Sequence, residues 1–309
     1  MSALLSAAAD YLALRRAVGF KLERHDQLLA SFIAFTEASG CLVVTTDVAL
    51  AWASAPKAAD AWWWTRRLSV VRGFARYLHR INPDHEVPPA GLITATVPRV
   101  TPYLFTETDL ERLLDSTGVL QPSFRAATYR TLFGLLAVTG MRISETINLD
   151  DRDVDVVEGV VTVRHTKFDK TRELVLHPTT VEALTGYREL SRTRSRKQGV
   201  TSFFLTTVGT RPNYPNVLAV FHQLIDQLDM SQRRRGDRPR IHDVRHSFAV
   251  RTMLDGYEAG GIDLGLRFAA LSTYLGHSKP ADTYWYLSAT PELLGQAAAR
   301  LEASLGTTS

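Results

Sequence analysis

Residues 154–176 read VDVVEGVVTVRHTKFDKTRELVL, and this stretch interrupts an otherwise helical pattern. Three short β-rich runs, Val154–Val157, Val160–Arg164 and Glu173–Leu176, are separated by Glu158-Gly159 and by the FDKT segment. Short β-rich runs divided by turn residues are typical of hairpins. We therefore expect a small antiparallel sheet within a mainly helical (α+β) chain.

Apolar residues recur three and four positions apart in the N-terminal part, which is typical of amphipathic helices. This pattern predicts helices over Leu4–Val18, His25–Ser39, Asp47–Ser54 and Ala61–His79. We expect Thr46 or Asp47 to cap the third helix. Trp62–Trp64 fall within the fourth helix, and three consecutive residues cannot share one helix face. One or two of these tryptophans should therefore lie in the core, and another at a surface or an interface.

The C-terminal part has the same helical pattern before and after the β-rich stretch. Thr106 is predicted to cap a helix, and Gly140 to end the helix over Phe124–Thr139. Further helices are predicted over Thr179–Arg192, Asn216–Asp229, His242–Tyr257, Leu266–Leu275, Ala281–Leu287 and Pro291–Leu305. The last of these, residues 291–305, has an apolar face that suits a neighbouring subunit and its own domain equally.

A proline-rich segment separates the two parts. Residues 82–102 hold five prolines and one glycine and show little periodicity. Proline resists helix formation and favours an extended spacer. We place a linker at residues 91–102, between a helical domain over residues 1–90 and a larger domain over residues 103–309.

The composition is that of a globular protein with a mild excess of positive charge. The 309 residues carry a formal net charge of +4, which by itself favours a polyanionic partner only weakly. Basic residues cluster at Arg192–Lys197 and at Arg233–Arg240. The second cluster directly precedes the HDVRH motif described below, and this position favours contact with phosphates. The candidate DNA-binding residues are Arg233, Arg234, Arg235, Arg238 and Arg240.

Cys41 is the only cysteine, so an intramolecular disulfide and a cysteine-based zinc site are excluded. A reducing, cytoplasmic compartment fits this usage. The longest apolar runs are too short to span a bilayer, and the N-terminus lacks the features of a signal peptide. We therefore expect neither a membrane partner nor an exported protein.

His242 and Arg245 are three residues apart in the HDVRH motif, so they share one face of the predicted helix. A fixed guanidinium repels a metal cation, and this pair is therefore a poor metal site. It is a good phosphate site, because a guanidinium can donate two parallel hydrogen bonds to phosphate oxygens. A polar surface cluster is the alternative for the motif in isolation.

Other short motifs are weak individually. Arg142 and Glu145 can form an ion pair on one helix face, which at a surface contributes little. Lys167 and Lys170 flank a predicted hairpin turn, where solvated lysines are the ordinary case. Tyr286 lies nine residues after the histidine of an LGH triplet. Its phenol has a pKa near 10 and needs nearby charge to become a nucleophile.

Four segments taken together resemble the tyrosine recombinase (phage integrase) family, in the type found in mobile-element integrases and transposases. They are TGMRISE (139–145), HTKFDKTREL (165–174), IHDVRHSFA (241–249) and YLGHSKPADTYWYLS (274–288). Their order and spacing match the family from about residue 103 onward. The sequence departs from the family at Thr146, where leucine is common, and at Ser288, where many members have histidine.

The resemblance assigns a role to each candidate residue. Tyr286 would attack the scissile phosphate, and Arg142 and Arg245 would clamp its oxygens. Lys167 would protonate the leaving oxygen, His242 would accept the tyrosine proton, and His277 would hydrogen-bond the phosphate. Glu145 would orient an arginine. Lys167 is preferred to Lys170, and Tyr286 to Tyr284, on motif position.

The resemblance also implies partners and cofactors. The helical domain over residues 1–90 would be a SAM-like core-binding domain, and the domain over residues 103–309 the catalytic domain. The partner would be double-stranded DNA with a specific recombination site, bound by a homotetramer. We expect no cofactor, no metal and no small-molecule substrate.

Three other functions compete with site-specific recombination. A type IB topoisomerase uses similar chemistry but relaxes supercoiled DNA as a monomer. A catalytically silent DNA-binding protein could share the fold, although six intact candidate catalytic residues argue against it. A helical interaction module would account for the tryptophans but not for the order of the motifs.

Overall fold

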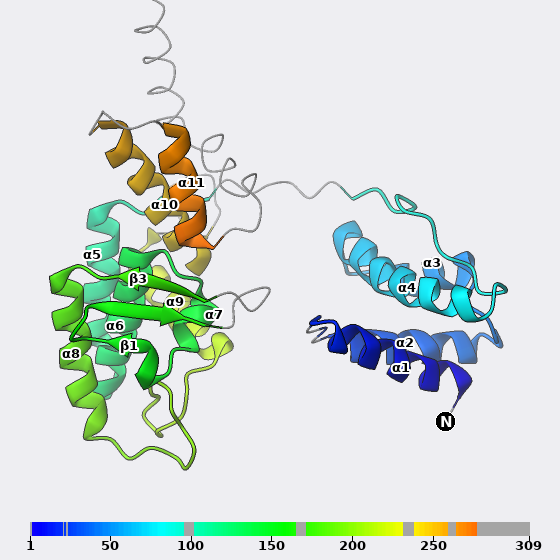
Figure 1. Cartoon of the computed structure of the whole chain (residues 1–309), viewed down its shortest axis with the longest axis horizontal. Helices are drawn as coiled ribbons and strands as arrows, with labels where there is room; N and C mark the ends of the chain where they lie inside the picture. The colour runs from blue at the N-terminus through cyan, green and yellow to red at the C-terminus, as the bar shows by residue number, and fades with distance from the viewer. Residues whose placement is uncertain are drawn as a thin grey trace, which may run out of the picture. The chain divides into compact units, whose positions relative to one another are not determined.

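The computed structural model describes residues 2–20, 22, 24–95, 102–164, 171–230, 238–258 and 264–276. Contacts divide the chain into two compact units, Met1–Val100 and Thr101–Ser309. Each unit has its own hydrophobic core. The helices and strands of both units are labelled in Figure 1.

Four helices form the described part of the N-terminal unit: α1 (Ala3–Ala17), α2 (His25–Ala38), α3 (Thr46–Ser54) and α4 (Ala61–Ile81). The helix α4 contacts the other three, and Phe32, Trp52 and Phe74 are almost fully buried between them. The rings of Phe32 and Trp52 meet edge to face, with centroids 5.3 Å apart. Aromatic packing therefore holds this bundle together.

Two predictions about this unit are wrong in detail. The third helix is capped by Thr45, whose side chain accepts a hydrogen bond from the Val48 backbone N–H, and not by Thr46 or Asp47. The WWW run places no tryptophan in the core. Trp62 is 43% exposed, which confirms the expectation that one of the three lies at a surface, but Trp63 and Trp64 are only partly buried. The tryptophan in the core is Trp52 of α3.

The C-terminal unit has a helical body and one small sheet. Its helices are α5 (Glu107–Ser116), α6 (Ser123–Thr139), α7 (Ile143–Ile147), α8 (Pro178–Arg192), α9 (Tyr214–Gln227), α10 (Ile241–Glu258) and α11 (Leu264–Leu275). Short 3-10 turns are η1 (Thr117–Val119) and η2 (Asp151–Asp153). The strands are β1 (Val154–Asp155), β2 (Val160–Val163) and β3 (Arg172–Val175). In Figure 1, α10 and α11 run side by side above the sheet.

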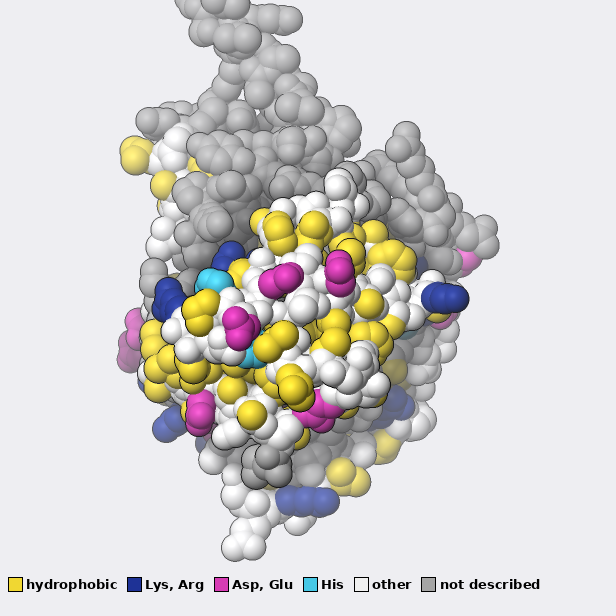
Figure 2. Space-filling model, turned by 90° about the vertical axis from the view of Figure 1, so that its right-hand side faces the viewer, with side chains coloured by type: hydrophobic (Ala, Val, Ile, Leu, Met, Phe, Trp, Pro, Cys, Tyr) yellow, Lys and Arg dark blue, Asp and Glu magenta, His cyan; other side chains and the backbone are white. Residues whose placement is uncertain are grey.

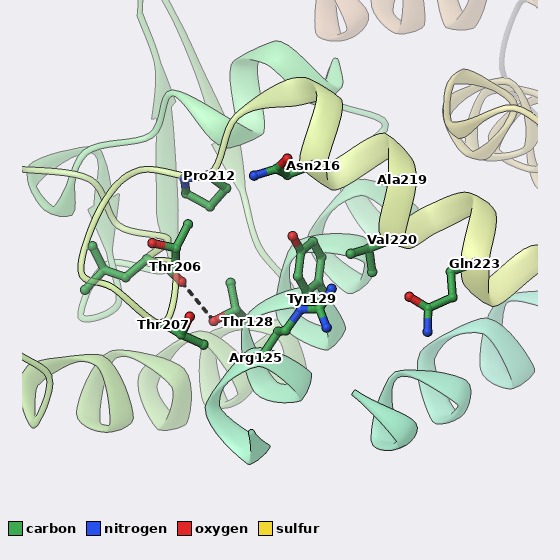
Figure 3. A pocket seen from close by; sticks show the side chains of 11 residues that line it. Arg125, Thr128, Tyr129, Thr206, Thr207, Pro212, Asn216, Ala219, Val220 and Gln223 are labelled. Atoms are coloured by element: carbon green, nitrogen blue, oxygen red, sulfur yellow. Dashed lines mark hydrogen bonds between the residues drawn. The ribbon is translucent and has the colours of Figure 1, made fainter. Parts of the chain in front are cut away.

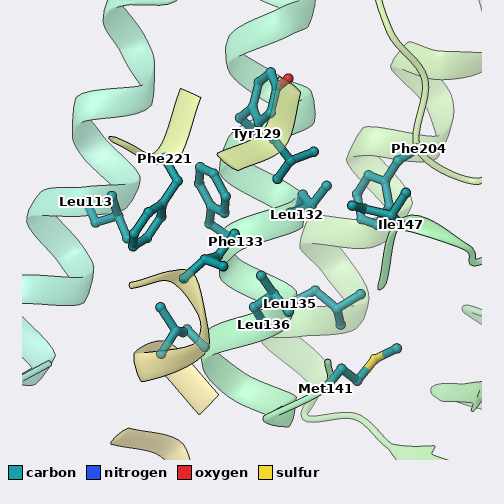
Figure 4. Packing of buried hydrophobic residues seen from close by; sticks show 14 of the residues in the cluster. Leu113, Tyr129, Leu132, Phe133, Leu135, Leu136, Met141, Ile147, Phe204 and Phe221 are labelled. Carbon is teal, nitrogen blue, oxygen red and sulfur yellow. The ribbon is translucent and has the colours of Figure 1, made fainter. Parts of the chain in front are cut away.

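The helix α6 is the centre of this unit, and it contacts α5, α7, α8 and α10. Figure 4 shows its apolar face, with Leu132, Phe133 and Leu136 pointing into the core. Phe133 meets Phe221 of α9 at a centroid distance of 5.8 Å. Both rings are about 1% exposed or less. A rigid central helix of this kind fixes the position of the residues that follow it, which include Arg142.

The sheet is antiparallel, with the order β1-β2-β3. Val161 pairs with Leu174, and Val163 pairs with Arg172. Val161, Val163 and Leu174 are buried and join the core of the unit. The sheet therefore packs one face against the helices, which is the usual arrangement for an antiparallel sheet.

The predicted fold class is confirmed: the described chain is mainly helical with one small antiparallel sheet. The residues predicted to begin one helix and to end another are also confirmed. Thr106 and Asp109 form a reciprocal capping box, and Gly140 ends α6 in the left-handed conformation. The predicted helices over 281–287 and 291–305 lie outside the described residues. Among the described helices, none is both long and apolar enough to cross a membrane.

Candidate active site

The position of Arg142 follows from the end of α6. Gly140 has a φ of 60°, a conformation that favours glycine. A Cβ at this position would also lie 2.4 Å from the ring of Phe248, so no larger residue fits there. Met141 is 1% exposed and anchors the turn in the core. Arg142 then precedes α7 in an extended conformation, and its side chain is one-third exposed. A guanidinium is thus presented at the surface from a rigid turn.

Glu145 lies in the first turn of α7, and its side chain is 8% exposed. Its carboxylate accepts hydrogen bonds from the Arg142 backbone N–H at 2.9 Å and from Arg142 Nη1 at 2.8 Å. Arg172, the first residue of β3, donates from Nη1 at 3.2 Å and from Nη2 at 2.8 Å. Burial would raise the pKa of Glu145, but the hydrogen bonds from Arg172 and Arg142 outweigh it and hold the pKa below its ordinary value.

Arg245 lies on α10 and is 2% exposed. Its Nη1 donates to the Gly140 carbonyl at 2.6 Å, and its Nη2 donates to the Leu275 carbonyl at 2.7 Å. Arg142 Nη2 donates to the next carbonyl, that of Gly276, at 3.1 Å. The two arginines, far apart in the sequence, are therefore brought together at the C-terminal end of α11.

His242 lies one turn before Arg245 on α10. Its ring meets that of His246 edge to face at 4.6 Å. His242 is an exposed residue, although enough protein atoms lie around its ring to remove part of the water that would solvate its charged form. This desolvation, reinforced by the positive charge of Arg245, lowers the pKa of His242 from 6.5 to about 4. At neutral pH His242 is therefore uncharged and can accept a proton.

The predicted DNA-binding arginines are described only in part. Arg238 pairs with Asp226 and donates to the His222 carbonyl. Arg240 donates to the buried carboxylate of Asp243 at 2.9 Å, and its side chain is 47% exposed. Both side chains are therefore fixed by carboxylates at the surface beside the start of α10.

Several candidates lie outside the described residues: Lys167, Lys170, Arg233, Arg234, Arg235, His277, Tyr284 and Tyr286. In the chain, His277 directly follows Gly276, whose carbonyl is bound by Arg142. The described part of the site thus comprises Arg142, Glu145, His242 and Arg245.

Arg172 was not singled out by sequence reasoning. It follows the predicted hairpin turn, and no motif spacing links it to Glu145, which lies 27 positions earlier. Only the register of β3 and the turn after α6 bring the two together. A search for a second arginine near the hairpin could have found it, but could not have identified its partner.

Several hollows lie elsewhere in this unit. One of about 270 Å³, seen in Figure 3, is lined by Arg125 and Tyr129 of α6 and by Asn216 and Gln223 of α9. None of the candidate residues lines it. Within the part of the chain that is described, no group of three or more His, Cys, Asp or Glu side chains is arranged to hold a metal ion.

The lowered pKa of His242 predicts a stability change with pH. The unfolded state takes up the proton at about pH 6.5, whereas the folded state resists it until about pH 4. His242 should therefore reduce the free energy of unfolding progressively as the pH falls from about 6.5 to about 4. Urea unfolding of wild type and His242→Gln across this range tests the prediction, with exposed His177→Gln as control. Equal pH dependence in wild type and His242→Gln would contradict it.

Comparison with known proteins identifies the family. The model for the phage integrase family matches residues 104–292, which is more than half of the chain. A putative integrase/recombinase, y4rB of Sinorhizobium fredii, is 38% identical over 98% of both chains. The tyrosine recombinase XerC of Chlorobaculum tepidum is 30% identical, over 73% of this chain and 68% of its own.

Solved structures agree on the fold. The integrase of transposon Tn1549, in complex with transposon right-end DNA, matches with a TM-score of 0.68 and 18% identity, over 98% of this chain and 99% of that one. The XerH site-specific recombinase, bound to its difH substrate, matches with a TM-score of 0.63 and 18% identity, over 91% and 80%. The resemblance that the sequence motifs indicated is confirmed. The chain belongs to the phage integrase family and is a tyrosine site-specific recombinase.

Proposed function

We propose that this chain cleaves and rejoins DNA at a specific site through a covalent bond between Tyr286 and a 3′-phosphate. The observation that carries the proposal is the convergence of Arg142 and Arg245 at the end of α11, directly before the LGH histidine. Neutral His242 lies one turn before Arg245 on α10 and within electrostatic reach of both arginines. Two guanidinium groups beside a neutral imidazole suit a phosphodiester, which carries one negative charge and needs a base for its nucleophile.

The proposed reaction is a pair of transesterifications. The Tyr286 oxygen forms a bond to phosphorus and loses its proton to His242, while the bond from phosphorus to the 5′-oxygen breaks. Lys167 gives a proton to that leaving oxygen, and His277 hydrogen-bonds the phosphate. The phosphotyrosine bond conserves the energy of the broken bond, so rejoining by the reverse steps needs no ATP. Arg142 and Arg245 supply the charge stabilisation that metal ions supply in other nucleases.

The surroundings of the site fit a long polyanion. Arg238 and Arg240 keep partly exposed guanidinium groups beside the start of α10, and Arg233, Arg234 and Arg235 directly precede them in the sequence. We assign these arginines to phosphate contacts. The proposed assembly is a homotetramer on DNA. The single cysteine favours the cytoplasm as the location of the reaction.

The N-terminal unit would contribute a second DNA contact through α4. Arg66, Arg76 and Arg80 are exposed and lie on one face of this helix, since Arg66 and Arg80 are close to four helical turns apart. Within the described residues, none of the three forms an ion pair with a carboxylate. By contrast, the surface shown in Figure 2 carries hydrophobic and acidic side chains in its middle, with Lys and Arg mainly toward its margins.

The nucleophile is tested with a pool of nicked duplexes that carry a randomised core. Wild type should form an adduct that survives detergent, in the presence of EDTA, and sequencing of the trapped DNA identifies the site. Tyr286→Phe should form no adduct, because it lacks the attacking oxygen. Tyr284→Phe is the matched control. An adduct that persists in Tyr286→Phe and disappears in Tyr284→Phe would assign the nucleophile to Tyr284.

The phosphate clamp is tested by Arg245→Lys. A lysine keeps the charge but loses the fork that holds the Gly140 and Leu275 carbonyls. Cleavage of the selected duplex should slow by about 100- to 1000-fold, the cost of losing a transition-state donor, with little change in DNA binding. Arg251→Lys, one or two turns further along α10, is the control. Cleavage by Arg245→Lys at the wild-type rate would refute the clamp.

The role of α4 in DNA binding is tested by the triple substitution of Arg66, Arg76 and Arg80 to Gln. The slope of log affinity against log salt concentration should become shallower by about 0.9 for each phosphate that is no longer neutralised by an arginine. Arg16→Gln is the control, because Arg16 is exposed on the same unit but already paired with Asp26 at 2.5 Å. An unchanged slope in the triple variant would exclude α4 from the DNA interface.

A further inference from the structure

Arg172 contacts the Glu145 carboxylate through its side chain alone, at two points. Its two terminal nitrogens donate to the two oxygens of Glu145, one to each, in the bidentate arrangement that suits a guanidinium and a carboxylate. Each oxygen then also accepts a hydrogen bond from Arg142, one from its side chain and one from its backbone. Four N–H groups from two arginines therefore hold one carboxylate.

This contact is shielded from water. The side chains of Arg172 and Glu145 are 14% and 8% exposed, so their attraction is screened less than that of a surface pair. A Cβ placed on Gly276 would lie 3.1 Å from Arg172 Nη1 and 3.7 Å from Arg142 Nη1. Both guanidinium groups thus lie against the same turn at the end of α11.

Charge balance explains why a second arginine is useful here. Glu145 alone would neutralise Arg142 and weaken its attraction for a phosphate. Arg172 shares the same carboxylate, so the three groups together keep a net charge of +1. In addition, Glu145 can fix the orientation of Arg142 only if it is itself held, and Arg172 is the group from another element that holds it.

We propose that Arg172 is a positioning residue for DNA cleavage: it holds the Glu145 carboxylate so that Glu145 fixes the guanidinium of Arg142 for phosphate binding. This inference rests on the proposed function. Arg172 begins β3, the strand that follows residues 165–170, among which Lys167 is found. It therefore also ties that strand to the turn at which Arg142 is presented.

The first test is the single-turnover cleavage rate on the duplex selected above. Arg172→Gln should slow cleavage by about 10- to 100-fold, by analogy with the range found for groups that orient metal ligands, with DNA affinity unchanged. Arg172→Lys should recover part of the rate, because it restores the charge without the fork. Arg164→Gln is the matched control. Arg164 flanks the same hairpin and pairs with the buried carboxylate of Asp153 at 2.6 Å.

The second test asks whether Arg172 acts through Glu145. If it does, Arg172→Gln combined with Glu145→Gln should be no slower than the slower single variant. Losses that multiply in the double variant would show independent roles and overturn the proposal. So would a wild-type rate for Arg172→Gln, or an equal loss of rate in Arg164→Gln.

The third test needs no DNA. Carbon NMR titration of the Glu145 carboxyl in the full chain should give a higher pKa in Arg172→Gln than in wild type, and no change in Arg164→Gln. An unmoved Glu145 pKa in Arg172→Gln overturns the proposal whatever the chain does to DNA. A wild-type chain that forms no adduct, with the Glu145 pKa raised in Arg172→Gln, would refute the proposed function and leave the ion pair established.

Discussion

The described site depends on one buried carboxylate. Glu145 lies almost out of contact with solvent, and an unpaired charge in such a place costs several kcal/mol (about 3–5 when one partner of a buried pair is removed). Arg142 and Arg172 offset this cost by donating four hydrogen bonds to the carboxylate. The carboxylate in turn joins the turn after α6 to the start of β3. Two segments that are distant in sequence are thereby held in one geometry.

The end of α11 supplies the second constraint. The last carbonyls of a helix have no partners within it and carry the negative end of the helix dipole. Here Arg245 binds the Leu275 carbonyl and Arg142 binds the Gly276 carbonyl. The same guanidinium groups that are proposed to bind phosphate therefore also fix the turn that leads into His277. A substitution in either arginine would disturb both functions.

The sequence predicts local features well and contacts between elements poorly. The Thr106 cap, the Gly140 helix end and the Arg142–Glu145 pair each depend on residues within four positions, so spacing was sufficient. Arg172 reaches Glu145 only through the strand register. The helical pattern likewise could not show that the tryptophan in the core is Trp52, on another helix, and none of the tryptophans at 62–64. Thr45 and Thr46 are equally good caps chemically, and only the backbone distinguishes them.

The charges of the site favour the proposed transition state over the bound substrate. Among the described side chains of the site, Arg142, Arg172 and Arg245 against Glu145 leave a net charge of +2, to which the proposed acid Lys167 would add, and His242 is neutral at pH 7. A phosphodiester carries one negative charge in the ground state, whereas the transition state for attack by a tyrosine oxygen gathers a second. An environment of +2 is therefore better matched to the transition state, and interactions stronger there than in the ground state are those that accelerate a reaction. The second arginine on Glu145 contributes to this excess of positive charge, because without Arg172 the carboxylate would cancel the charge of Arg142.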